Sequence, residues 1–263
     1  MNMAKISELK TYIKSNPMQL DVIMKEVYES LTAGQQGFTM FDGGSNKGWH
    51  AWRMIQLPGC GEVYAVEADP SMKQVLTDNL NKWHKAPNPK LHIVGKALQN
   101  NPEITEIPWM SSHTHVGRSS ILASNETAPT IWNEHEDVEY RDTVSVPATT
   151  IDQILKNAEN VPFLKLDLEG ADFLALQGAA HTLRKKRPVI AYENSSKAPQ
   201  VHGYDVHDIR SYFDSLGYIP LNYVGVPMVS GTWFTFHEAW AVPVEKYTMT
   251  LRLIKKSVRE RIG

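Results

Sequence analysis

The sequence has little cysteine and almost no net charge. Cys60 is the single cysteine among 263 residues, so the chain cannot form an internal disulfide, and a reducing compartment is permitted. Lys and Arg number 27 against 29 Asp and Glu, and the net charge of −2 argues against a nucleic-acid surface built on bulk positive charge. No apolar run has the length of a membrane helix or a signal peptide. We therefore expect a soluble cytoplasmic protein without nucleic-acid or membrane partners; its oligomeric state is unknown.

Enough apolar sequence is present for a sizeable core. Hydrophobic residues make up 42% of the chain and charged residues 21%. Strand-like and helix-like stretches alternate from Phe38 onward, which predicts an α/β fold with a mostly parallel sheet. The last two strands, Tyr218 to Val224 and Thr232 to Val242, should pair antiparallel because only a short loop joins them. We predict three segments: a helical N-terminal extension over 1–34, a core domain over 35–245 and a basic tail over 246–263.

The alternation stops between Gly95 and Val161. Prolines interrupt this stretch, and its strand-like pieces are short, as in Glu139 to Val146. We interpret residues of about 100–147 as an insertion between the third and fourth strands, lying over the carboxyl edge of the sheet, where long loops form ligand sites. Beyond the insertion, Ala171 to Arg184 is predicted to form one helix.

A glycine-rich turn follows the first strand. The apolar run that ends at Phe41 is followed at once by Asp42, and helix-like spacing begins at Trp49. The glycines between them are Gly43, Gly44 and Gly48. A strand, a tight loop and a helix N-terminus allow backbone to approach a nucleotide-like ligand, although glycines also occur in turns for conformational reasons alone.

The second strand ends in Glu67, about 20 residues past the turn, where such folds hold a ribose. The chain contains neither the phosphate-binding string GxxxxGK with Ser or Thr nor the dinucleotide fingerprint GxGxxG, which disfavours a nicotinamide enzyme. An acid such as Asp42 before the turn repels a pyrophosphate but suits a cationic ligand such as S-adenosylmethionine.

Polar residues cluster where the fourth and fifth strands should end. Lys165 and Asp167 share one face of the fourth strand, and a buried lysine is costly unless it is paired. We favour a site role for Asp167 and a supporting one for Lys165; a purely structural tie is the alternative. Glu193 and Asn194 end the fifth strand, so with Asp167 they could bind Mg²⁺ through oxygen. Equally, Glu193 and Asn194 could cap a loop or bind acceptor hydroxyls.

The insertion contains further candidates for ligand contact. His113 and His115 alternate as a metal pair might, but no cysteine lies nearby and His135 is distant, so zinc is disfavoured. Trp109 and Trp132 could stack on a sugar ring, or could be ordinary core or surface tryptophans.

Several strings together resemble the FkbM-type methyltransferases. They are FDGGSNKG at 41–48, VYAVEADP at 63–70, KAL at 96–98, SVPATTID at 145–152, LKLDLEGADFLALQGA at 164–179 and RPVIAYEN at 187–194, with a loose match at RSSIL, 118–122. The resemblance implies a Rossmann-like class I methyltransferase fold that uses S-adenosylmethionine, commonly to methylate hydroxyls of sugars or other small metabolites.

The resemblance also implies roles for residues. Asp42 and the turn residues Gly43, Gly44, Ser45, Asn46 and Gly48 should hold the methionine end of the cofactor. Glu67 and Ala68 should hold the ribose, with Asp167 also near the cofactor. Ala97 and Leu98 should flank the adenine, with core packing as the alternative.

The catalytic candidates are Asp167, Lys165 and Glu169. In metal-dependent methyltransferases of similar pattern a Lys or His can stand three residues after the aspartate and serve as base, but here that position is Gly170, so the base must be Glu169, a histidine of the insertion or another group. We predict an O-methyltransferase acting on a sugar or another small hydroxylated metabolite. The alternatives are an N-methyltransferase of a small amine and a non-catalytic ligand-binding protein with the same fold.

Overall fold

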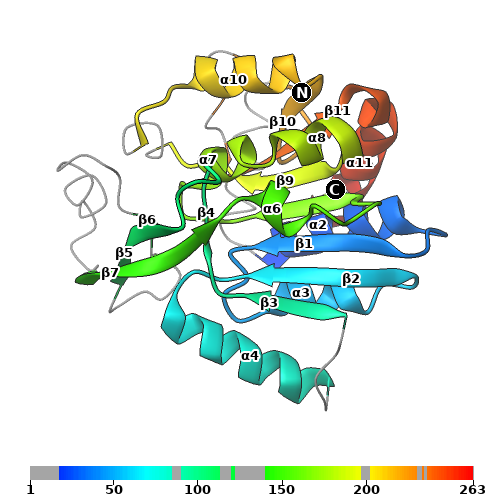
Figure 1. Ribbon diagram of the computed structural model, residues 1–263. Helices are drawn as coiled ribbons and strands as arrows, with labels where there is room; N and C mark the ends of the chain where they lie inside the picture. The colour runs from blue at the N-terminus through cyan, green and yellow to red at the C-terminus, as the bar shows by residue number, and fades with distance from the viewer. Residues whose placement is uncertain are drawn as a thin grey trace.

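A seven-stranded sheet forms the centre of the computed structural model, which describes residues 18–84, 90–112, 120–121, 140–196, 202–229, 233 and 236–262 (Figure 1). Its strands are β1 (Phe38–Gly43), β2 (Cys60–Val66), β3 (Leu91–Val94), β8 (Phe163–Leu166), β9 (Val189–Glu193), β10 (Tyr218–Asn222) and β11 (Glu238–Pro243). They lie in the order β10-β11-β9-β8-β1-β2-β3. The predicted helix over 1–17, and the residues His113, His115, His135 and Trp132, lie outside the described part of the chain.

The strand directions confirm the predicted Rossmann-like α/β fold. From β3 through β2, β1 and β8 to β9, every neighbouring pair is parallel. β11 runs antiparallel to both β9 and β10. The last strand of the chain is therefore antiparallel, as predicted. The strand order reverses between β1 and β8, and in open parallel sheets ligands bind outside the carboxyl ends of the strands at such a point.

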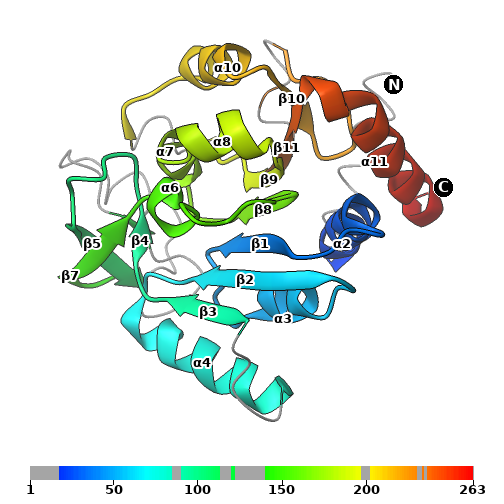
Figure 2. The same cartoon turned by 45° about the vertical axis from the view of Figure 1, so that its right-hand side comes forward.

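Helices cover both faces of this sheet (Figure 2). On one face lie α2 (Met18–Thr32), α3 (Trp49–Ile55), α4 (Pro70–His84) and α11 (Tyr247–Ile262). On the other lie α6 (Ile151–Ile154), α7 (Asp172–Gln177), α8 (Ala180–Lys186) and α10 (Val206–Ser215). Successive strand residues alternate between the two layers: Met40 packs into the first and Phe41 into the second.

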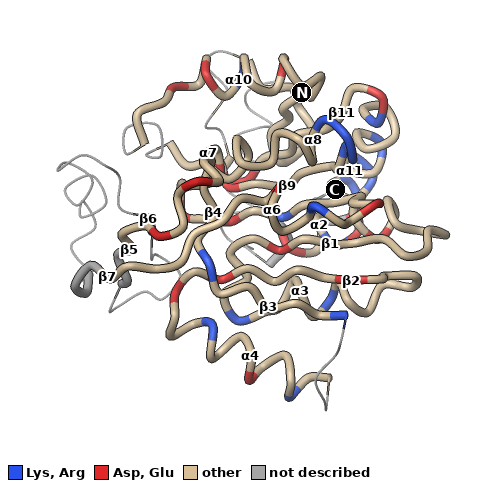
Figure 3. The backbone as a smooth tube through the Cα atoms, viewed as in Figure 1, with Lys and Arg blue, Asp and Glu red and all other residues tan. Residues whose placement is uncertain are grey.

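The described parts of the N-terminal extension and the C-terminal tail belong to the core. Tyr28 of α2 and Ile254 of α11 are both completely buried in the same apolar layer. The helix predicted in the tail is observed as α11, which follows the short 3₁₀ helix η2 (Val244–Lys246). Lys and Arg gather on α11 and at the end of α8 (Figure 3). No helix within the described ranges is long and apolar enough to cross a membrane.

The insertion contributes to a second sheet of four strands, in the order β4-β7-β5-β6. These strands are β4 (Ala97–Leu98), β5 (Glu106–Ser112), β6 (Ser120–Ile121) and β7 (Tyr140–Thr149). The prediction of only short strand pieces was wrong, because β7 has ten residues and pairs with β5 along most of its length. Figure 1 shows this sheet beyond the carboxyl ends of the central strands, where the sequence predicted the insertion to lie.

The single helix predicted over Ala171 to Arg184 is in fact two helices, α7 and α8. The chain breaks at Gly178, where an added Cβ would lie 2.1 Å from the carbonyl oxygen of Gln99. Asp152 accepts hydrogen bonds from the backbone N–H groups of His181 and Thr182, at 2.9 and 2.7 Å, and so caps the new helix start. Close packing against β4 therefore interrupts a segment whose own pattern is helical.

Candidate functional site

A cavity of about 200 Å³ lies at the carboxyl ends of β1, β2 and β8. Its walls combine the glycine turn, the segments that follow β2, β3 and β8, and Trp109 of the insertion. The lining residues are Gly44, Asn46, Val66, Glu67, Ala68, Lys96, Ala97, Leu98, Trp109, Asp167, Leu168, Glu169 and Ala171. The structure brings together at this cavity eight of the site residues predicted from separate stretches of sequence, although ligand binding by them stays a prediction: Gly44, Asn46, Glu67, Ala68, Ala97, Leu98, Asp167 and Glu169. Val66, Lys96, Leu168 and Ala171 were missed, since nothing in their residue type marks a site.

The glycine turn packs tightly against both neighbouring strands. The N–H groups of Gly44 and Ser45 donate to the carbonyl of Val66, at 3.0 and 2.9 Å. Gly44 has a φ of +72°, and a Cβ added to it would lie 1.9 Å from the carbonyl oxygen of Asp167. Only glycine allows the backbone of β1 to approach the tip of β8 so closely.

We expect Gly44→Ala to destabilise the protein markedly more than Gly34→Ala. Both glycines have positive φ, +72° and +77°, so each alanine meets the left-handed strain of about 1–2 kcal/mol. Gly34 has nothing within 4 Å of the added Cβ, whereas at Gly44 backbone must also move. Urea unfolding should show at least about twice the loss in free energy for Gly44→Ala. Equal losses would mean that the turn tolerates a shift of β8.

Glu67 presents an oriented carboxylate to the cavity. Its Oε2 accepts from the N–H of Asn46 at 2.8 Å, and its Oε1 from the N–H of Asp69 at 2.9 Å. Burial raises the pKa of Glu67 above its ordinary value, although these two N–H groups oppose the shift. Each carboxylate oxygen can accept a further hydrogen bond, so the pair suits two neighbouring hydroxyls such as those of a ribose.

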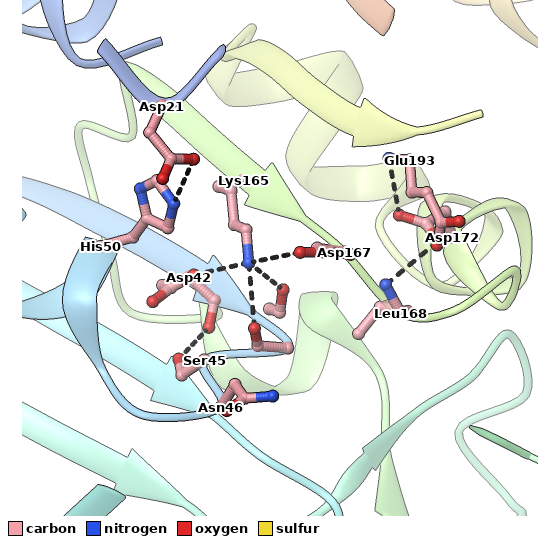
Figure 4. Close-up of polar contacts among 12 residues, drawn as sticks. Asp21, Asp42, Ser45, Asn46, His50, Lys165, Asp167, Leu168, Asp172 and Glu193 are labelled. Atoms are coloured by element: carbon pink, nitrogen blue, oxygen red, sulfur yellow. Dashed lines mark hydrogen bonds and ion pairs between the residues drawn. The ribbon is translucent and has the colours of Figure 1, made fainter. Parts of the chain in front are cut away.

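A buried ammonium joins the turn to the tip of β8 (Figure 4). The Nζ of Lys165 donates to the carbonyl of Gly44 at 2.9 Å and lies 3.3 Å from Asp42 Oδ1 and 3.5 Å from Asp167 Oδ2. Burial lowers the pKa of Lys165, but the charges of Asp42 and Asp167 outweigh it and hold that pKa above its ordinary value. Lys165 therefore stays protonated at neutral pH and does not act as a base.

Asp42 lies beneath the turn instead of facing the cavity. Its side chain is completely buried, and its Oδ2 accepts from the N–H of Ala51 in the first turn of α3, at 3.0 Å. Ser45 folds back onto the same residue, with Oγ donating to the Asp42 carbonyl at 2.7 Å. Asp42, Gly43, Ser45 and Gly48 are not among the cavity-lining residues. Asp42 thus fixes the shape of the turn and the position of Lys165, and its contact with a cofactor stays a prediction.

The loop after β8 brings two carboxylates to the cavity. Asp167 is 54% exposed, and Glu169 follows in a left-handed conformation with φ of +51°. Asp167 has the exposure that a group acting on a bound molecule needs. A carboxylate in this place can orient a hydroxyl or accept its proton.

Behind this loop lies a buried acid that the sequence analysis missed. Asp172 accepts from the N–H groups of Leu168 and Glu193, both at 3.2 Å, and so fixes one side of the loop. Burial, and next the charge of Asp167, raise the pKa of Asp172 to about 7. Glu193 Oε2 accepts from the N–H of Gly170 at 3.2 Å. The sequence feature that could have drawn attention to Asp172 is an acid in the first turn of the predicted helix, directly after the loop of the fourth strand.

Two of the three residues considered for Mg²⁺, Glu193 and Asn194, have hydrogen-bond partners within the protein. Asn194 is buried, and its Nδ2 donates to the carbonyls of Trp233 and Phe236, at 2.5 and 3.4 Å. Burial, followed by the charges of Asp172 and Glu169, raises the pKa of Glu193 well above its ordinary value. No group of three or more His, Cys, Asp and Glu side chains in the described ranges could hold a metal ion. Magnesium binding stays a hypothesis.

Comparisons with known proteins give one family. The family model described as the Methyltransferase FkbM domain matches residues 42–220. Among solved structures, a methyltransferase FkbM from Methylobacillus flagellatus is 16% identical with a TM-score of 0.47; the match covers 79% of this chain but 44% of that one. An O-methyltransferase from Bacillus cereus in complex with SAH is 12% identical with a TM-score of 0.42, over 92% of each chain. The search of curated proteins finds no match.

Proposed function

The chain belongs to the FkbM methyltransferase family, and we propose that it transfers a methyl group from S-adenosylmethionine to a hydroxyl of a sugar or another small hydroxylated metabolite. One observation supports this most: the cavity at the strand tips combines a backbone-oriented Glu67, a glycine turn under steric constraint and the exposed carboxylate of Asp167. The FkbM match covers the turn, Glu67 and Asp167.

The cavity residues fit such a cofactor. Glu67 offers two oriented oxygens for ribose hydroxyls, and Ala97 and Leu98 provide an apolar wall for a flat base beside them. Gly44 leaves room that a side chain would fill. When bound, S-adenosylmethionine supplies a methyl group already activated by its sulfonium sulfur.

The residues of the chain then have two tasks. The walls of the cavity align the acceptor with the methyl group, because an in-line displacement depends on orientation. Asp167 would accept the proton of the acceptor hydroxyl, whose oxygen would receive the methyl group that the cofactor supplies. Lys165 stays charged and fixes the position of Asp167, while Asp172 and Glu193 hold the following loop.

Glu67→Gln should weaken S-adenosylhomocysteine binding by about 1–3 kcal/mol, or roughly 5- to 150-fold, measured by titration calorimetry. The amide keeps the shape of the carboxylate but loses charge and one acceptor. Glu62→Gln is the matched control. Glu62 lies on β2, the strand that Glu67 follows, and its side chain is 46% exposed and paired with His92. Its affinity should equal that of the wild type.

Two results would contradict the proposal. One is tight binding of NAD with no binding of S-adenosylmethionine or S-adenosylhomocysteine. The other is cofactor binding without methyl transfer from labelled S-adenosylmethionine to any fraction of a pool of hydroxylated metabolites, which would favour a non-catalytic ligand-binding protein. Mass spectrometry of the labelled product would also distinguish O-methylation from N-methylation.

A further inference from the structure

Trp109 of β5 lines the cavity from the insertion. It is 7% exposed and packs in a small apolar cluster with Ala97, Val146 and Ala148, against which Ala68 also lies. Ala68 follows Glu67 directly, and Ala97 lies in β4, after the third strand. Trp109 therefore lies on the apolar side of the cavity, beside the expected ribose position.

The indole N–H of Trp109 has no hydrogen-bond partner within the described part of the chain. A buried donor without a partner is costly, and buried tryptophans usually find an acceptor for this group. Two other buried tryptophans can be compared in their indole N–H groups. That of Trp240 donates to the carbonyl of Tyr223 at 3.0 Å, whereas that of Trp233 also has no acceptor among the described residues. Trp109 differs from both in lining the cavity, so a bound molecule can supply its acceptor.

We infer that Trp109 recognises the nucleobase of the cofactor by donating a hydrogen bond from its Nε1–H to one ring nitrogen of the base. This inference rests on the proposed function, because it takes the occupant to be an adenosyl compound. The base must lie next to the ribose held by Glu67, where the apolar wall of Ala97 and Leu98 suits a flat aromatic ring. Adenine has three ring nitrogens, N1, N3 and N7, that accept hydrogen bonds at its edge, which matches a donor-only indole.

The packing of Trp109 favours a contact with the base over one with the acceptor. Asp167 and Glu169 come from the loop after β8, and their carboxylates suit hydroxyl groups. Trp109 instead shares its cluster with Ala97 and Ala68, on the wall formed after β2 and β3. This packing associates Trp109 with the residues expected at the base.

Calorimetry with S-adenosylhomocysteine and its 1-deaza, 3-deaza and 7-deaza analogues tests this inference. Trp109→Phe keeps an aromatic ring but removes the donor, and should weaken binding of the parent compound by about 10-fold. One of the three analogues should bind the wild type about 10-fold more weakly and lose nothing further in Trp109→Phe. Trp83→Phe is the control and should bind these compounds as the wild type does. Trp83 lies in α4, and its ring packs against Trp49 and Trp52 of α3.

The outcomes separate the two hypotheses. If S-adenosylhomocysteine does not bind the wild-type protein, the proposed function fails and this inference fails with it. If it binds the wild type and Trp109→Phe equally, or if every analogue loses the same factor in both proteins, the nucleobase role alone is rejected. The deaza series on the unmodified protein keeps the test decisive even if Trp109→Phe folds poorly, because an analogue series without any weakened member rejects the hydrogen bond. A higher KM for the acceptor with unchanged cofactor affinity would instead place Trp109 at the acceptor.

Discussion

Asp167→Asn is expected to lower turnover by about 100- to 1000-fold, the usual contribution of a positioned proton acceptor, with S-adenosylhomocysteine affinity changed by no more than a few-fold. Asparagine keeps the size and the hydrogen-bonding oxygen of the side chain but cannot take up a proton. Asp167 is half exposed at the cavity, so the substitution removes little packing. Single-turnover methyl transfer and calorimetry on the same preparation would separate the two effects.

Asp214→Asn is the matched control for this variant. Asp214 is 55% exposed and paired with Arg210 at 2.9 Å, so it resembles Asp167 in exposure and in having one cationic neighbour, but it lies on α10. Its turnover should equal that of the wild type. Chelation of the unmodified enzyme shows whether Asp167 acts as a base or as a metal ligand. Activity that survives chelation supports Asp167 as the proton acceptor. Activity that is lost on chelation and restored by Mg²⁺ supports Asp167 as a metal ligand. An Asp167→Asn enzyme of normal turnover would exclude both roles.

Local patterns were sufficient to predict the central fold. Strands such as β1, β3 and β9 are short apolar runs with clear ends, and their alternation with helices allows few arrangements other than a parallel sheet. The site followed from the same logic, because carboxyl ends of parallel strands meet at one edge. Gly44, Glu67 and Asp167 therefore meet at the cavity although more than 100 residues separate the first from the last.

The features that the sequence did not reveal depended on contacts between distant segments. The direction of the Asp42 carboxylate is set by Lys165, from β8, and by Ala51, from α3. Asn194 turns to the carbonyl of Trp233, across a loop whose path no local pattern specifies. The break between α7 and α8 follows from the approach of Gln99 to Gly178. In each case the residue type was informative, but its partner lay in another element.

Lys165→Met should destabilise the protein by about 3–5 kcal/mol, the loss typical when one member of a buried ion pair is removed. Methionine fills a similar volume, so the main change is the loss of the ammonium that contacts Asp42, Asp167 and the carbonyl of Gly44. In this variant Asp167 can be solvated by water. Asp42 is completely buried, so it would lose its cationic partner without gaining water, which is costly. Urea unfolding followed by tryptophan fluorescence would measure the loss.

A double-mutant cycle with Asp42→Asn tests this explanation directly. Asparagine can still accept from the N–H of Ala51 through its amide oxygen, so α3 keeps its contact while the buried charge is removed. The double variant should then recover part of the stability lost in Lys165→Met, and the two effects should differ from additivity by more than about 1 kcal/mol. Additive losses would show that the ammonium acts on the turn carbonyls alone. Because Lys165 touches both the turn and Asp167, a folded double variant with low turnover and normal cofactor affinity would show that this lysine also positions the proton acceptor.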